Sequence, residues 1–155
     1  IMIGEIRDRE TALVAVQAAL TGHLVLSTLH TNDSCGAITR LLELGVPDYL
    51  IKASLSGVMA QRLVRLLCRD CQGCASSASG QPCLLCRGTG FHGRTGVFEL
   101  LVPSESLRAR IGAGADLASL QRQALSEGLL DLKRCGEAKV ASGLTCQEEV
   151  LRVCA

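Results

Sequence analysis

Apolar runs and polar breaks alternate along the chain in a way that predicts strands and helices in turn. Residues 1–3 are apolar and are followed by Glu5 and a charged run, as in a buried strand that ends in an acid. Between residues 10 and 21 apolar positions recur at helical spacing, and Gly22 suits a left-handed helix end. The apolar run at residues 23–28 predicts a second strand.

A strand, a helix and a strand in succession predict a parallel crossover unit with a right-handed connection. The carboxyl ends of parallel strands meet at one sheet edge, so Glu5 should lie close to residues 27–33, which include His30. An acid there could hold a magnesium-bound water or act as a base toward it. The alternative interpretation is a strand end with a solvated glutamate.

The remaining pattern predicts further helices and two more strands. Helices are expected at 34–44, capped by Asp33 or Ser34, and at 49–57, and strands within 58–67 and 94–101, with a loop at 73–80. Short amphipathic helices are expected at 105–111, 117–125, 130–141 and 147–153. The fold class is therefore α/β with an all-helical C-terminal region, which holds no evident catalytic cluster.

Four of the nine cysteines form two C-x2-C pairs, Cys68 with Cys71 and Cys83 with Cys86. Two such pairs bring four thiolates to one centre, the tetrahedral set that a structural Zn²⁺ accepts. An iron–sulfur cluster takes the same thiolates, whereas a redox dithiol would need a thioredoxin-like unit that the pattern does not show. We expect zinc to order the segment between residues 67 and 90.

The other cysteines are expected to be free. Cys74 lies three residues after Cys71 and could replace a ligand, and His92 could do so if one cysteine is absent from the site. We expect Cys74 to be a free thiol and His92 to lie at the surface. The remaining cysteines, in helical segments, should act as small apolar residues: Cys35, Cys135, Cys146 and Cys154.

Composition argues against several classes of protein. The formal net charge is +1 over 155 residues and aromatic residues make up 2%, which disfavours nucleic-acid binding through a basic surface or through stacking. Arginines 62, 65, 87 and 94 could form a basic patch, but subunit contacts or strand pairing are preferred. With no apolar run of membrane-spanning length and no signal peptide, a cytosolic chain without disulfides is expected.

Several motifs in order give the chain a resemblance to one family. Residues 1–12, IMIGEIRDRETA, resemble the Walker B region of bacterial secretion ATPases, the hexameric motors of type II secretion and type IV pilus assembly. Residues 21–33, TGHLVLSTLHTND, are similar to the histidine box of that family. The likeness extends to residues 60–65, the cysteine pairs, and residues 93–100 and 143–152.

The resemblance implies part of a RecA-like ATPase core with a tetracysteine zinc subdomain and a helical C-terminal region. On this basis residues 1–67 belong to the core, 68–90 form the metal-binding insertion, 91–103 return to the core, and 104–155 are helical. The family's cofactors are ATP, Mg²⁺ and Zn²⁺.

The resemblance also implies roles for individual residues. Glu5 matches the Walker B glutamate that polarises the attacking water, and His30 matches the histidine-box residue near the γ-phosphate. Gly4 is expected beside them in the nucleotide site. Arg7 is expected to have a structural or coupling role, and His23 to be packed or to cap a helix.

The implied protein is an ATP-hydrolysing motor for type II protein secretion, a homo-hexamer that works with inner-membrane platform proteins. It would be cytoplasmic and peripheral to the inner membrane. Residues 57–65 and 95–100 favour type II secretion over type IV pilus assembly, and retraction motors generally lack the cysteine insertion. A second hypothesis is a non-enzymatic zinc-binding module that contacts a partner.

Two features depart from the family pattern. The spacer between the cysteine pairs is short, and no G-x4-G-K-[ST] phosphate-binding loop occurs in the sequence. The chain alone is therefore expected not to bind ATP well. We expect it to be the C-terminal half of the motor, with the phosphate-binding loop before Ile1.

Overall fold

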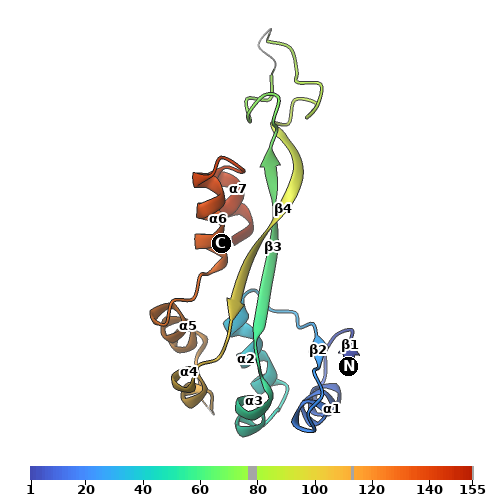
Figure 1. The fold of residues 1–155 in the computed structure, drawn as a ribbon, viewed down its shortest axis with the longest axis vertical. Helices are drawn as coiled ribbons and strands as arrows, with labels where there is room; N and C mark the ends of the chain where they lie inside the picture. The colour runs from blue at the N-terminus through green and yellow to red at the C-terminus, as the bar shows by residue number, and fades with distance from the viewer. Residues whose placement is uncertain (77–79, 113, 155) are drawn as a thin grey trace. The chain divides into compact units, whose positions relative to one another are not determined.

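The computed structural model describes residues 1–76, 80–112 and 114–154. It is an α/β fold with the following elements: β1 Met2–Ile3, α1 Arg9–Leu20, β2 Leu26–Ser27, α2 Ser34–Glu43, α3 Asp48–Ser54, β3 Val58–Leu67, β4 Phe91–Leu101, α4 Glu105–Arg110, α5 Leu117–Ser126, α6 Leu132–Ala141 and α7 Gln147–Cys154 (Figure 1). The order of strands and helices matches the prediction. Part of the predicted loop, residues 77–79, lies outside the described residues.

The chain divides into two compact units. Unit one contains Ile1–Ala60 and Leu100–Leu129, and unit two contains Gln61–Glu99 and Leu130–Ala155. The helices after residue 104 are thus shared: α4 and α5 belong to unit one, and α6 and α7 belong to unit two.

Unit one begins with the predicted parallel pair of strands. Met2 pairs with Leu26 and Ile3 with Ser27. Beyond the strands, the backbone N–H of Ile6 donates to the carbonyl of Thr28 at 3.0 Å. The segment that carries Glu5 therefore continues alongside the segment that leads to His30.

Polar caps fix where the helices of unit one begin. Asp8 accepts a hydrogen bond from the backbone N–H of Thr11 at 2.8 Å, which caps α1 and lowers the pKa of Asp8. Asp33 caps α2 in the same way, accepting from the N–H of Gly36 at 2.7 Å. Gly22 follows α1 with a φ of +93°, as predicted for a left-handed helix end.

The core of unit one is aliphatic, as the shortage of aromatic residues requires. One cluster combines buried side chains from all five helices of the unit, among them Ala12, Ile38, Ile51, Leu107 and Leu120. In place of large aromatic side chains, this core combines small apolar faces from several helices. This packing supports the edge at which Glu5 and His30 lie.

Unit two contains most of β3 and β4, which pair and run in opposite directions, with α6 and α7 beside them (Figure 1). The side chain of Glu149, from α7, is fully buried. It accepts from the guanidinium groups of Arg152 at 2.6 Å and Arg65 at 2.7 Å, and from the backbone N–H of Arg65 at 2.9 Å. These contacts hold the pKa of Glu149 far below its usual range and attach α7 to β3.

Glu149→Gln should lower the free energy of unfolding at pH 7 by about 2–3 kcal/mol, because two guanidinium groups lose a buried carboxylate. Glu137→Gln, at an exposed position of α6, is the control and should change it by less than about 0.5 kcal/mol. Urea unfolding followed by circular dichroism measures both.

The difference in unfolding free energy between wild type and Glu149→Gln should depend on pH. The pKa of Glu149 in the folded chain lies below its ordinary value of 4.5, so the carboxylate's contribution is present above that pH and is lost as the pH falls further. The difference between wild type and Glu149→Gln should therefore shrink below pH 4.5. A constant difference down to pH 3 would contradict this assignment.

Candidate functional site

The structure brings Glu5 and His30 into direct contact at the end of the parallel strand pair. Nε2 of His30 lies against Oε1 of Glu5. The other carboxylate oxygen, Oε2, accepts from Arg7 through Nε at 2.6 Å and Nη2 at 2.5 Å. An acid, an imidazole and a guanidinium thus meet at the edge where the sequence predicted the acid and the histidine.

Exposure differs sharply among these three side chains. Glu5 is 21% exposed, whereas Arg7 is 75% and His30 is 84% exposed. The hydrogen bond from Arg7 lowers the pKa of Glu5, with a smaller contribution from the charge of His30. Glu5 is therefore ionised at neutral pH, which is the form that can accept a proton.

Gly4, the residue before Glu5, lies next to open space. Its carbonyl accepts from the hydroxyl of Thr28 at 2.7 Å, which ties the two segments together. Among the described residues other than its chain neighbours Ile3 and Glu5, no atom lies within 4 Å of the position that a Cβ on Gly4 would take. A ligand could approach the backbone there.

His23 lies away from this carboxylate, at the end of α1. Its Nδ1 is 3.2 Å from the hydroxyl of Thr21 and 3.3 Å from the carbonyl of Ala18. Contacts with the last turn of a helix agree with the capping role expected for it.

A second candidate site is formed by the four paired cysteines of unit two. The Sγ atoms of Cys68, Cys71, Cys83 and Cys86 all lie within 4.8 Å of one another, and all four residues are buried. The separations are 3.8 Å between Cys68 and Cys83 and 3.7 Å between Cys71 and Cys86. Tetrahedral Zn–S bonds of about 2.3 Å place sulfur atoms about 3.8 Å apart, so the donor set fits zinc.

The same distances exclude disulfides between these partners, which need an S–S bond of about 2.05 Å. Burial raises the pKa of Cys71 to about 11. Burial also opposes ionisation of Cys86, but hydrogen bonds, led by the N–H of Gly90 at 3.3 Å, lower its pKa to about 6. All four could be buried as thiolates only together with a cation, and a divalent metal ion would supply that charge.

The segment that carries the four cysteines also brings two stretches of backbone close together. A Cβ on Gly90 would lie 2.7 Å from the carbonyl oxygen of Gly73, so only glycine fits there. Cys74 and His92 are exposed, and within the described part of the chain neither belongs to the group of close ligand atoms.

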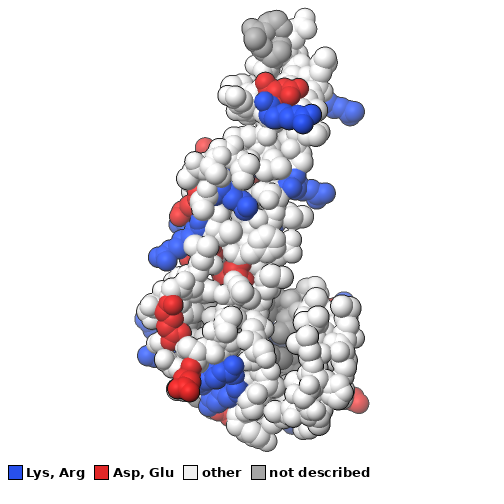
Figure 2. All heavy atoms as spheres, viewed as in Figure 1, with Lys and Arg blue, Asp and Glu red and all other residues white. Residues whose placement is uncertain are grey.

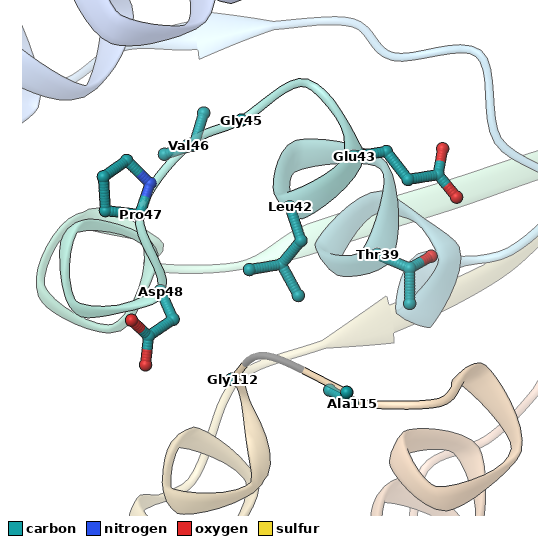
Figure 3. Close-up of a pocket in the computed structure, with 10 residues that line it drawn as sticks. Thr39, Leu42, Glu43, Gly45, Val46, Pro47, Asp48, Gly112 and Ala115 are labelled. Atoms are coloured by element: carbon teal, nitrogen blue, oxygen red, sulfur yellow. The ribbon is translucent and has the colours of Figure 1, made fainter.

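An open hollow of about 510 Å³ lies elsewhere in unit one (Figure 3). Leu42 and Thr39 of α2 face the segment that carries Gly112 and Ala115. Its two carboxylates are already paired, Glu43 with Arg40 at 3.3 Å and Asp48 with Lys52 at 2.7 Å. Neither Glu5 nor His30 lines this hollow, so it does not extend the candidate site.

Cationic side chains are dispersed on the face drawn in Figure 2, with acidic and uncharged groups between them. Arg65 is engaged by Glu149 and also stacks over the ring of Phe91, with its guanidinium carbon 4.1 Å from the ring centre. In the described part of the chain, no helix combines the length and apolarity needed to cross a membrane.

The fold is similar to that of solved secretion ATPases. The Legionella pneumophila ATPase DotB matches 99% of this chain over 37% of its own, with a TM-score of 0.72 and 23% identity. The pilus retraction motor PilT with bound ADP matches 99% of this chain over 38% of its own, with a TM-score of 0.71 and 26% identity. This chain therefore has the α/β fold of part of these two proteins.

The chain belongs to the type II/IV secretion system protein family, whose model matches residues 1–152. It is 48% identical to the type II secretion system protein HxcR of Pseudomonas aeruginosa and 45% identical to type II secretion system protein E of Klebsiella pneumoniae. It is 43% identical to the type IV pilus assembly ATPase TfpB of Acinetobacter baylyi. Each match covers 99% of this chain and about a third of the relative, at 33%, 34% and 30%.

Sequence reasoning did not place Arg7 in contact with Glu5. A signal was present, because Glu5 and Arg7 are oppositely charged and only two residues apart. The pairing of Arg65 with Glu149 carried no such local signal, since 84 positions separate them.

The cysteine site predicts one zinc ion per chain, measured by atomic absorption on purified protein. Cys83→Ser should lose most of the bound metal, because one ligand of a closed four-thiolate set is gone. Cys74→Ser is the matched control and should keep it. Equal zinc content in Cys83→Ser and wild type would show that these cysteines do not hold the metal.

Proposed function

We propose that residues 1–155 are part of an ATP-hydrolysing motor that powers type II protein secretion across the outer membrane through a pseudopilus. The contact between Glu5 and His30 at the strand edge is the observation that carries the proposal. Membership of the secretion family and the similarity to relatives named as type II secretion proteins support it.

In the proposed reaction, Glu5 orients a water molecule and accepts its proton while the water oxygen attacks the γ-phosphorus. His30 lies within reach of the same carboxylate and would face the γ-phosphate. Gly4 would offer open backbone to the bound nucleotide. Mg²⁺, bound together with ATP, would neutralise charge on the phosphates.

We propose that Cys68, Cys71, Cys83 and Cys86 hold a structural Zn²⁺. A closed set of four thiolates leaves no position open for substrate, so this ion would order the chain and take no part in hydrolysis. On this proposal residues 68–90 are a metal-binding insertion in a core formed by 1–67 and 91–103, with 104–155 as the helical region.

The ATPase activity is proposed for the full-length protein that carries this chain. The 155 residues include no G-x4-G-K-[ST] motif, so the isolated chain is not expected to hydrolyse ATP. We propose a homo-hexamer at the cytoplasmic side of the inner membrane, bound to platform proteins of the secretion system.

Two alternatives rest on particular observations. A role in type IV pilus assembly is favoured by the 43% identity to an assembly ATPase of that system. A non-enzymatic zinc-binding interaction module is favoured by the closed cysteine site. Loss of secretion or of pili on deletion of the gene separates the first alternative from our proposal.

In the full-length ATPase, Glu5→Gln should retain nucleotide binding and lose turnover by about 10²–10⁴-fold, because the amide cannot accept a proton from water. Glu10→Gln, an exposed acid in the first turn of α1, is the control and should hydrolyse ATP at the wild-type rate. Phosphate release and binding of a fluorescent nucleotide measure the two properties. Wild-type turnover in Glu5→Gln would refute the assignment of Glu5.

His30→Gln should lower kcat by at least about 10-fold, because the imidazole that would face the γ-phosphate is lost. It should not lower the melting temperature, because the side chain is 84% exposed and packs little. His92→Gln, an exposed histidine of β4, should leave both quantities at wild-type values. A fall in melting temperature that matched the fall in kcat would mean that His30 supports the fold and not the reaction.

A further inference from the structure

The two oxygens of the Glu5 carboxylate have different surroundings. Both donors of Arg7, Nε and Nη2, converge on Oε2, at 2.6 and 2.5 Å. Oε1 has almost no solvent-accessible surface, and Nε2 of His30 lies against it. One oxygen is therefore fixed by a guanidinium, and the other is covered by an imidazole.

The guanidinium constrains the carboxylate in a way that an ammonium group could not. Two N–H groups of a rigid planar group restrain the position of Oε2 from two directions, whereas an ammonium group would offer a single contact. Because residues 5 and 7 are only two apart in the chain, the contact needs no other element to bring it about.

The cover on Oε1 is easier to remove. His30 is 84% exposed and comes from the segment after β2, which has no regular secondary structure at that residue. Moving the imidazole away would open Oε1 to water while the contact of Arg7 with Oε2 stays intact.

We propose that Arg7 is a positioning residue that anchors Oε2 of Glu5, so that Oε1 is the oxygen that takes the proton from the attacking water. His30 covers Oε1 until it turns toward a phosphate. This inference rests on the proposed ATPase function and adds to it the assignment of each carboxylate oxygen and of Arg7.

The proton and electron balance is complete within this arrangement. The water oxygen forms a bond to the γ-phosphorus and its proton goes to Oε1 of Glu5. The bond between the γ-phosphorus and the bridging oxygen breaks, and its electron pair stays on the ADP that leaves. The proton on Glu5 is later returned to solvent or to the released phosphate.

An exposed arginine has little structural reason to be here. At 75% exposure, its ion pair adds little to stability, so removing it should not unfold the chain. The titratable and charged groups that contact Glu5 in the described part of the chain are Arg7, from the same segment, and His30. Both must be included in any pH-dependent test.

The kinetic test uses Arg7→Gln, Arg7→Lys and Arg9→Gln in the full-length ATPase. Arg7→Gln should lower kcat by about 10–100-fold with KM for MgATP within twofold, because a poorly oriented base costs rate and not binding. Arg7→Lys should recover part of the loss through a single contact. Arg9, exposed and directed over Gly45, is the matched control and should behave as wild type.

The pH profile separates positioning from a structural role. Without Arg7 the pKa of Glu5 should rise toward its ordinary value, so the acid limb of kcat/KM should move to higher pH. Measuring the profile also in a His30→Gln background removes the titration of the imidazole. A kcat within twofold of wild type together with an unmoved acid limb would overturn the inference.

A second measurement on the 155-residue chain does not depend on catalysis. The ¹³C shift of the Glu5 carboxyl, followed by NMR against pH, should show a higher midpoint in Arg7→Gln than in wild type or Arg9→Gln. Equal midpoints would overturn the anchoring even if the protein is an ATPase. A different outcome is a raised midpoint in Arg7→Gln together with wild-type turnover in Glu5→Gln. It would refute the proposed role of Glu5 in hydrolysis and would leave the anchoring of Oε2 by Arg7 intact.

Discussion

The pairing between the segments that follow β1 and β2 is the constraint on which the candidate site depends. Two hydrogen bonds beyond the strands fix their register, from the N–H of Ile6 to the carbonyl of Thr28 and from the hydroxyl of Thr28 to the carbonyl of Gly4. A slip of one residue would turn the Glu5 side chain to the opposite face. The geometry of the carboxylate is thus set by the backbone before any side chain acts on it.

In unit two, polar groups and thiols help to hold the elements together, as packed aromatic side chains do in other proteins. The cysteine cluster is joined by Leu85 as its partly buried apolar neighbour, which leaves little apolar surface to bury in that loop. A metal–thiolate centre can replace such a core because its binding free energy, about 10–16 kcal/mol in peptides, is comparable with the stability of a domain. The carboxylate of Glu149 similarly holds α7 to β3 through charged hydrogen bonds.

Local signals in the sequence sufficed for most elements, and long-range contacts account for the differences. The caps at Asp8 and Asp33 and the spacing of the cysteine pairs are encoded within a few residues. The helix predicted to reach residue 57 ends at Ser54, where the guanidinium of Arg108 donates to the carbonyls of Lys52 and Leu55. The sequence near residue 54 cannot predict a contact with an arginine more than 50 positions away.

The candidate site shows the same limit at closer range. Strand order and the direction of parallel pairing were enough to place Glu5 beside His30, since both follow from the alternation of apolar runs. Which oxygen each neighbour contacts depends on side-chain torsions that no pattern of residue types specifies. The sequence therefore predicts the residues at the edge, and the structure assigns them to the atoms of the carboxylate.

Burial distinguishes the arginine–carboxylate cluster at Glu149 from the one at Glu5. Glu149 is fully buried, so its ion pairs with Arg65 and Arg152 offset a large desolvation cost and their loss would weaken the fold. Glu5 keeps contact with solvent and its partners are mostly exposed, so the same chemistry contributes little to stability. An ion pair that hardly stabilises the fold can be broken and remade at low cost, and a base that must meet water in each cycle requires that property.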